Sequence, residues 1–122
     1  MTEDNTKNLL TIELKDGTVE IELFPEDAPN HVERIKELAQ EGLYDGVAFH
    51  RVMEGFMAQT GDVKYGNSKD YDDNSVGTGG SDKPDLNAEF NERKHVRGTC
   101  SMARSSLPDS ANSQFFICFD TA

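Results

Sequence analysis

Apolar and polar positions alternate in two short runs near the start of the chain. The run 9–14 (LLTIEL) and the run 19–23 each place apolar side chains at every second position, and Asp16-Gly17 lies between them. Alternation with a period of two is typical of a strand with one buried face, and an Asp-Gly pair between two such runs is typical of a tight turn. The pattern therefore predicts a β-hairpin.

The spacing of apolar residues then changes to a helical period. Across 32–39 they recur at intervals of three and four residues. Asn30 followed by Glu33 is an Asn variant of the capping box, and Gly42 stands where a C-terminal cap is expected. We therefore predict a helix at about 30–41 with Asn30 as its N-cap.

The remaining apolar runs are short and predict further strands. Two aromatic-rich runs, 47–52 and 56–60, follow the helix, and two more lie at 99–103 and 114–119. Between these pairs, residues 64–95 hold six apolar side chains in 32, which predicts a long surface loop. Short strands around one helix predict a mainly β fold, a barrel or a sandwich.

Length and charge narrow the class of protein. The chain has 122 residues, 12 Lys and Arg, 23 Asp and Glu, and a net charge of -11, which predicts one domain over 1–122 whose first eight residues form a disordered leader. A chain this acidic offers no basic stripe, so nucleic-acid binding is not expected. No apolar run approaches the length of about 20 residues that spans a membrane, and the polar start is unlike a secretory signal. We expect a cytoplasmic protein.

The sequence gives little evidence for a site that binds a metal ion or a cofactor or that carries a nucleophile. His31, His50 and His95 are scattered, so no structural zinc is expected. The acidic segment 70–74 departs from the calcium-loop pattern and favours a solvated loop, while 77–80 (GTGG) favours flexible backbone over a phosphate cradle. No Gly-x-Ser-x-Gly motif places a nucleophilic serine. We expect no cofactor.

The two cysteines favour a reducing compartment. Cys100 and Cys118 are the only cysteines, and they form no Cys-x-x-Cys motif. A disulfide between them is the less favoured alternative.

One pairing of residue types stands out. Arg51 is followed closely by Phe56 and Met57 on a neighbouring predicted strand, which places a permanently charged donor beside aromatic and thioether groups. A plain core with a surface cation would explain such a trio in most proteins. The rest of the sequence favours a binding site instead.

Six short blocks follow one another along nearly the whole chain. They are Phe49-His50-Arg51-Val52, Gly55-Phe56-Met57-Ala58-Gln59-Thr60-Gly61-Asp62, Gly77-Thr78-Gly79-Gly80, Glu89-Phe90, Ser101-Met102-Ala103 and Ser113-Gln114-Phe115-Phe116-Ile117. Together they resemble the signature blocks of the cyclophilin-type peptidyl-prolyl isomerases, and Arg104 resembles the bacterial cytoplasmic branch. The resemblance implies a cyclophilin-like antiparallel β-barrel and an enzyme that accelerates rotation about Xaa-Pro peptide bonds and assists protein folding.

The same resemblance implies roles for the residues of a proline pocket. Arg51 would be the catalytic arginine. Phe56, Met57 and Phe116 would form the floor and walls of the pocket, and we expect Phe116 to be a large buried side chain.

Further residues would line a groove beside that pocket. Gln59 and Gln114 would position the peptide, and Ala103 and Arg104 would line the groove, with Arg104 standing where many relatives carry Asn. His50 matches a position near the pocket, where a structural role and a functional role are equally compatible with the sequence.

Several partners follow from the resemblance. They are proline-containing peptides, unfolded or folding client proteins and cyclosporin-like cyclic peptides, with no cofactor, and a complete barrel would be monomeric. A non-catalytic module that binds proline-containing peptides remains the alternative function.

The pattern departs from the family at the end of the chain. Relatives continue through further strands and a second helix that close the barrel, and a Trp-Leu pair and a His that border their pocket have no counterpart here. We therefore expect these 122 residues to be the front part of a longer product. An intact mass of 13.5 kDa for the native protein would contradict this expectation.

Overall fold

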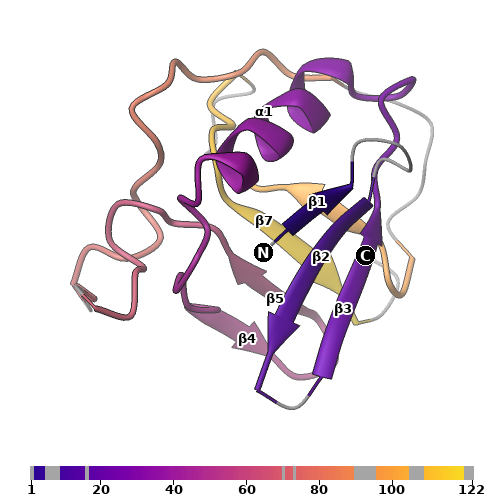
Figure 1. Cartoon of the computed structure of the whole chain (residues 1–122). Helices are drawn as coiled ribbons and strands as arrows, with labels where there is room; N and C mark the ends of the chain where they lie inside the picture. The colour runs from indigo at the N-terminus through magenta and orange to yellow at the C-terminus, as the bar shows by residue number, and fades with distance from the viewer. Residues whose placement is uncertain are drawn as a thin grey trace.

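The computed structural model describes residues 2–4, 9–15, 17–69, 71–72, 74–89, 96–104 and 109–119. Within these ranges the chain forms strands and one helix in two groups (Figure 1). Their bounds are β1 Thr2–Asp4, β2 Leu9–Leu14, β3 Gly17–Glu22, α1 Pro29–Gln40, β4 Arg51–Met53, β5 Met57–Thr60, β6 Cys100–Met102 and β7 Phe115–Cys118.

The predicted hairpin is confirmed. Strands β2 and β3 pair antiparallel, with Leu9 opposite Glu22 and Leu14 opposite Gly17. The alternation has the expected effect, because Leu10 and Ile12 are 1% and 2% exposed while their neighbours in the strand are more accessible. The hairpin thus presents one apolar face to the interior.

The first residues of the chain differ from the disordered leader that we expected. Strand β1 pairs antiparallel with β2, and Thr2 lies opposite Thr11. The second edge of β2 carries backbone N–H and C=O groups that β3 does not use, and a further strand satisfies them. The rest of the expected leader, residues 1 and 5–8, lies outside the described residues.

Helix α1 begins one residue earlier than predicted, and the predicted N-cap is wrong. Pro29 is the first helical residue, a position that suits its fixed φ and missing N–H, and Ala28 is the N-cap. The cap comes instead from Glu89, whose carboxylate accepts hydrogen bonds from the backbone N–H groups of Asn30 (3.1 Å) and His31 (2.9 Å). A distant side chain therefore does what the local Asn30–Glu33 pair was expected to do.

The predicted C-terminal cap of α1 is confirmed. Gly42 has φ +74°, and its N–H donates to the carbonyl of Ala39 (3.1 Å). The N–H of Leu43 donates to the carbonyl of Leu38 (3.0 Å), which completes a Schellman motif. Glycine suits this position because other residues resist a positive φ.

The second sheet has the strand order β4-β5-β7-β6, with all neighbours antiparallel. Strand β4 is shorter than the predicted run 47–52. Before it, Val47 forms only an isolated bridge with Asn67, and the N–H of Ala48 donates to the carbonyl of Gly66 (2.8 Å). That stretch pairs with the loop after β5 and so cannot extend β4.

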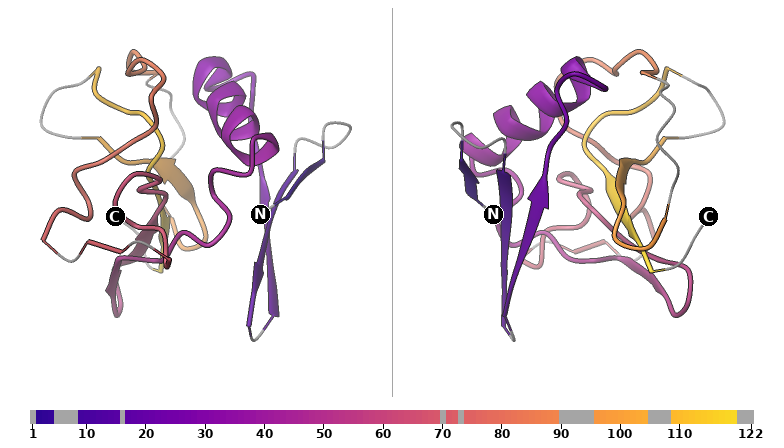
Figure 2. Two further views of the ribbon diagram at one scale, coloured as in Figure 1. Left: turned by 60° about the vertical axis from the view of Figure 1, so that its left-hand side comes forward. Right: turned by 90° about the vertical axis from the view of Figure 1, so that its right-hand side faces the viewer.

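The core lies between the two sheets and α1. Figure 2 shows α1 and the hairpin on one side of the molecule and the four-stranded sheet on the other. Tyr44 and Phe115 meet edge to face at 5.7 Å, and the Tyr44 hydroxyl donates to the carbonyl of Ser113 (2.5 Å). The buried cluster consists of Leu10, Ile12, Ile21, Ile35, Leu38, Ala39, Tyr44 and Phe115.

The fold class is mainly β and antiparallel, as predicted. In the part of the chain that the structure describes, the two sheets do not join into a closed barrel, and β3 and β6 are edge strands. Neither α1 nor any other helix of the described residues has the length and apolarity needed to cross a bilayer.

Candidate functional site

Four side chains from four strands form a row across the second sheet. Arg51 lies opposite Gln59, Gln59 opposite Phe116, and Phe116 opposite Ser101. Residues directly opposite each other in antiparallel strands share a face of the sheet. This cross-strand row therefore places a guanidinium, an amide, an aromatic ring and a hydroxyl side by side.

The opposite face of the sheet belongs to the core. Phe115 lies opposite Thr60 and Ile117 opposite Ala58, and Phe115 and Ile117 pack into the buried cluster. Met57, two residues before Gln59, lies on the face of the cross-strand row and is 4% exposed. The alternation of β5 and β7 thus places Gln59 and Phe116 on the opposite face of the sheet from Phe115 and Ile117.

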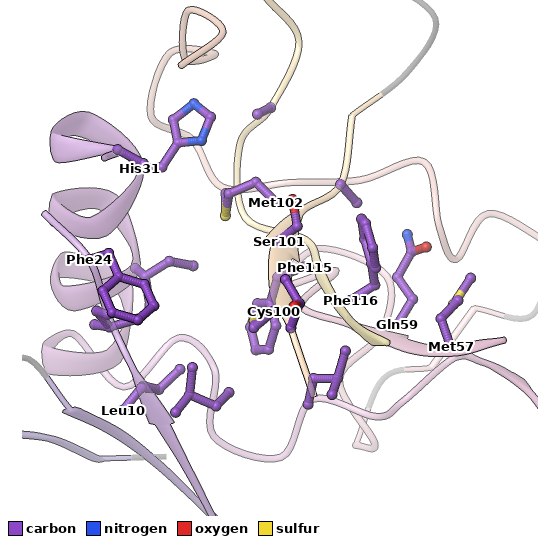
Figure 3. Close-up of a pocket in the computed structure, with 18 of the residues that line it drawn as sticks. Leu10, Phe24, His31, Met57, Gln59, Cys100, Ser101, Met102, Phe115 and Phe116 are labelled. Carbon is purple, nitrogen blue, oxygen red and sulfur yellow. The ribbon is translucent and has the colours of Figure 1, made fainter. Parts of the chain in front are cut away.

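A large cavity of about 1600 Å³ contains the cross-strand row. Figure 3 shows Met57, Gln59 and Phe116 on one side of the strands, and Leu10, Phe24 and His31 on the other. The cavity therefore extends along both faces of this part of the sheet. Seven of the predicted site residues line it: Arg51, Phe56, Met57, Gln59, Ala103, Arg104 and Phe116.

The two adjacent phenylalanines of β7 have different environments. Phe115 is 1% exposed, whereas Phe116 is only partly buried. Phe116 is therefore less buried than we expected, because alternation along β7 places its ring on the opposite face of the sheet from Phe115. Phe56 is 45% exposed at the turn between β4 and β5, so it lies at the rim of the cavity.

Gln114 does not line the cavity, although it was predicted to position the peptide. It is 9% exposed, and its Nε2 donates to the carbonyls of Gly77 (3.0 Å) and Gly79 (2.9 Å). Its Oε1 accepts a hydrogen bond from Gln59 Nε2 (2.8 Å). Gln114 therefore contacts the cavity indirectly, through lining residues that include Gln59 and Gly77.

His50 also lies outside the cavity lining. Its ring packs near Gly77, and its Nδ1 has no hydrogen-bond partner among the described residues. Burial lowers the pKa of His50, the carboxylate of Asp62 partly opposes this, and Arg51 adds to it. The imidazole is therefore neutral through most of the physiological range.

Asp62 is a residue to which the sequence reasoning gave no role. It is 0% exposed. Its Oδ1 accepts from the N–H groups of Lys64 (3.1 Å) and Tyr65 (2.9 Å), and its Oδ2 from those of Gly77 (2.7 Å) and Gly79 (3.0 Å). The interpretation of 77–80 as flexible backbone is thus wrong, because this carboxylate anchors the loop.

The remaining sequence candidates show local structural roles. Asp72 Oδ1 accepts from the N–H groups of Asn74 (3.0 Å) and Ser75 (3.3 Å), and His31 Nε2 lies 2.9 Å from the carbonyl oxygen of Asn87. Across the described ranges no group of three or more His, Cys, Asp or Glu side chains could hold a metal ion. Asp70, Asp73, Phe90 and His95 lie outside those ranges.

The two cysteines are free thiols. Ile117 lies opposite Cys100, and Met57 lies opposite Cys118, so the two sulfur atoms point to different faces of the sheet. Burial, with a smaller effect of Cys118, raises the pKa of Cys100 to about 12. The arrangement favours the reduced form over the disulfide alternative.

Comparison with known sequences gives one consistent result. A family profile described as "Cyclophilin type peptidyl-prolyl cis-trans isomerase/CLD" matches residues 9–122. The chain is 62% identical over 115 residues to a protein of Brucella suis named "Probable peptidyl-prolyl cis-trans isomerase". That alignment covers 93% of this chain, and the chain spans 59% of the relative's length.

Solved structures give the same result for the fold. A cyclophilin from Hirschia baltica superposes with a TM-score of 0.78 at 29% identity, covering 100% of this chain and 60% of that one. A cyclophilin-type peptidyl-prolyl cis-trans isomerase from Cryptosporidium parvum, crystallised in the presence of the dipeptide Ala-Pro, also gives 0.78, at 28% identity. That superposition covers 93% of this chain and 69% of the Cryptosporidium parvum chain.

Proposed function

The chain belongs to the cyclophilin-type peptidyl-prolyl cis-trans isomerase family, and from this premise we propose that it catalyses rotation about Xaa-Pro peptide bonds. The observation that carries the proposal is the cross-strand row, which puts the Arg51 guanidinium and the Phe116 ring on one face of one sheet and in one cavity. Proline-containing peptides are the proposed substrates.

The reaction requires only a small reduction of the activation barrier by the protein. Rotation is slow because resonance gives the peptide C–N bond partial double-bond character, with a barrier of about 18–20 kcal/mol. Uncatalysed prolyl isomerisation takes tens to hundreds of seconds, so about 10 turnovers per second needs only ~3–4 kcal/mol off the barrier. One or two interactions that strengthen in the transition state are enough.

The side chains of the row suit these interactions. Phe116 and Met57 offer an apolar surface on which the pyrrolidine ring can rest while the acyl group turns. The Arg51 guanidinium can donate a hydrogen bond to the proline nitrogen, whose lone pair becomes available as resonance is lost. Arginine stays charged beside aromatic rings, where lysine would tend to lose its proton.

The same proposal extends to the natural substrates, further ligands and cellular location of the protein. Folding or unfolded client proteins are the proposed natural substrates, cyclosporin-like cyclic peptides are proposed ligands of the same cavity, and the cytoplasm is the proposed location. The crystal structure determined with Ala-Pro supports a dipeptide-sized proline ligand for this fold. Ala103 and Arg104 are the proposed groove residues beyond the proline subsite.

Exchange NMR on a short Xaa-Pro peptide tests the proposal, because it measures cis-trans interconversion without a coupled protease. We expect the chain to accelerate exchange and the Arg51→Ala variant to lose most of the acceleration while still binding the peptide. Binding by the folded wild-type chain without acceleration would support a non-catalytic proline-peptide module instead.

A further inference from the structure

The buried carboxylate of Asp62 connects two segments that the proposed reaction leaves unexplained. It lies two residues after the end of β5 and accepts hydrogen bonds from four backbone N–H groups, two from 64–65 and two from 77–79. A buried carboxylate is unfavourable without such donors. Asp62 therefore fixes the 77–79 loop against the end of the strand that carries Gln59.

The glycines of the loop allow this close approach. A Cβ on Gly79 would collide with Asp62 Oδ1 and would lie 2.8 Å from Tyr65 Cδ2. Gly77 has φ +98°, a conformation that other residues resist. The loop can place both N–H groups on the carboxylate because neither residue has a side chain.

The carbonyl groups of the same two glycines orient the amide of Gln114. Gln114 Nε2 has two hydrogens, and both are used by the carbonyls of Gly77 and Gly79. If the amide were reversed, its oxygen would face two carbonyl oxygens with no hydrogen between them. The loop therefore decides which end of the Gln114 amide faces Gln59.

The orientation of the Gln114 amide in turn determines the orientation of the Gln59 amide. Gln114 presents Oε1, so Gln59 must present Nε2, and the two atoms lie 2.8 Å apart. Gln59 Oε1 receives no hydrogen bond from the described residues, and Gln59 lines the cavity opposite Arg51 in the register of β4 and β5. The free end of the Gln59 amide is therefore an acceptor.

We propose that Asp62 is a positioning residue for substrate binding, acting through Gly77, Gly79 and Gln114 to hold Gln59 with its Oε1 acceptor available to a peptide N–H. This amide relay, from Asp62 to Gln59, rests on the proposed isomerase function. It adds to that function a requirement for a backbone N–H donor in the bound peptide, beside the proline.

The variant Asp62→Asn tests the amide relay at its first residue. Asparagine keeps the volume but turns an NH₂ group toward backbone N–H donors, which displaces the loop. The loss of one substrate hydrogen bond should raise KM for an Xaa-Pro peptide about tenfold and leave kcat within about twofold. The side-chain amide protons of Gln114 should also lose their slow exchange with solvent in NMR spectra.

A second variant keeps the test decisive if Asp62→Asn does not fold. Gln114→Glu leaves Asp62 intact but removes both N–H donors to the loop, and it should raise KM by a similar factor. Asp72→Asn is the matched control, since Asp72 caps backbone N–H groups in the same loop without touching Gly77 or Gly79. We expect its KM to equal that of the wild type.

The outcomes separate the relay from the isomerase function itself. A wild-type KM in a folded Gln114→Glu or Asp62→Asn variant would overturn the relay, and so would an equal rise in Asp72→Asn. If the wild-type chain binds peptide without isomerising it, the proposed function fails, and the same variants then test the relay through peptide affinity and amide exchange. Weaker binding with faster Gln114 exchange would support it.

Discussion

Arg51 and Gln59 lie opposite each other on the neighbouring strands β4 and β5, and both line the cavity. The pairing is informative because one group is a permanent donor and the other an oriented amide. At this scale the effects of individual side chains can be measured separately by experiment.

Arg51→Ala should lower kcat far more than it weakens peptide binding. The guanidinium contact forms mainly in the transition state, and a hydrogen bond to a charged group contributes about 1.5–3 kcal/mol, which corresponds to a loss of roughly 10- to 100-fold. Exchange NMR gives the rate and a peptide titration gives the affinity. Lys15→Ala, which removes one exposed positive charge from the hairpin turn, serves as the control. Equal losses in rate and affinity would contradict the role.

Phe115→Ala and Phe116→Ala should separate stability from binding. Truncating Phe115 leaves a cavity in the core and should lower the free energy of unfolding by about 3–5 kcal/mol. Phe116 is partly exposed in the cavity, so its truncation should cost clearly less stability but weaken peptide binding. Urea denaturation and peptide titration measure the two effects. A larger loss of stability in Phe116→Ala than in Phe115→Ala would contradict the assignment of Phe115 to the core.

His50 should make the fold weaker in mild acid. Its pKa in the folded state is lowered below the usual 6.5, so the unfolded chain takes up the proton more readily. The free energy of unfolding should therefore fall as the pH drops through 6.5 toward the lowered pKa, and it should not depend on His50 at higher pH. Denaturation between about pH 5 and 8, compared with His50→Gln, checks the sign.

The same reasoning predicts a nearly flat pH profile for isomerisation. An arginine side chain is charged throughout the range from about pH 6 to 9, and burial lowers the pKa of His50, so we expect little change in rate there. A steep loss of activity through the histidine range would instead assign His50 a part in the reaction.

At the scale of elements, the N-terminus of α1 depends on a residue outside the helix. Glu89→Ala should lower the free energy of unfolding by about 1–2 kcal/mol, because the N–H groups of Asn30 and His31 lose their acceptor. Glu33→Ala is the matched control, since it removes the residue that a local capping box would need. Thermal denaturation of both variants decides between the two caps, and a larger effect of Glu33→Ala would contradict the structure.

The sequence predicted the elements whose causes are local. The hairpin follows from alternation, and the end of α1 follows from Gly42, because both depend on neighbouring residues. The sequence could not predict that Glu89 caps α1 or that the residues before β4 pair with Gly66 and Asn67, since these contacts join distant segments.

For the candidate site, the family resemblance predicted roles for Arg51 and Phe116, and the strand register places both in one row. The burial of Phe115 in place of Phe116 is a matter of strand alternation that residue identity alone does not decide. Asp62 lay within a recognised block, but its role depends on glycines 15 and 17 residues away.

At the scale of the whole molecule, the net charge of -11 should influence which substrates arrive fastest. Basic proline-containing peptides should associate faster than acidic ones at low salt. Raising ionic strength from about 0.01 to 0.15 M shortens the Debye length from about 30 to 8 Å, so the difference should largely disappear. Stopped-flow association with Lys-flanked and Glu-flanked peptides measures it, and equal rates at low salt would exclude steering.

The distant cap of α1 also sets an order of events during translation. Glu89 is synthesised 59 residues after Asn30. At about 5–20 residues per second, roughly 3–12 s separate the start of the helix from its cap. Throughout that interval the N–H groups of Asn30 and His31 lack the carboxylate that accepts their hydrogen bonds in the folded chain. The helix becomes complete only when the long loop has left the ribosome and folded back onto it.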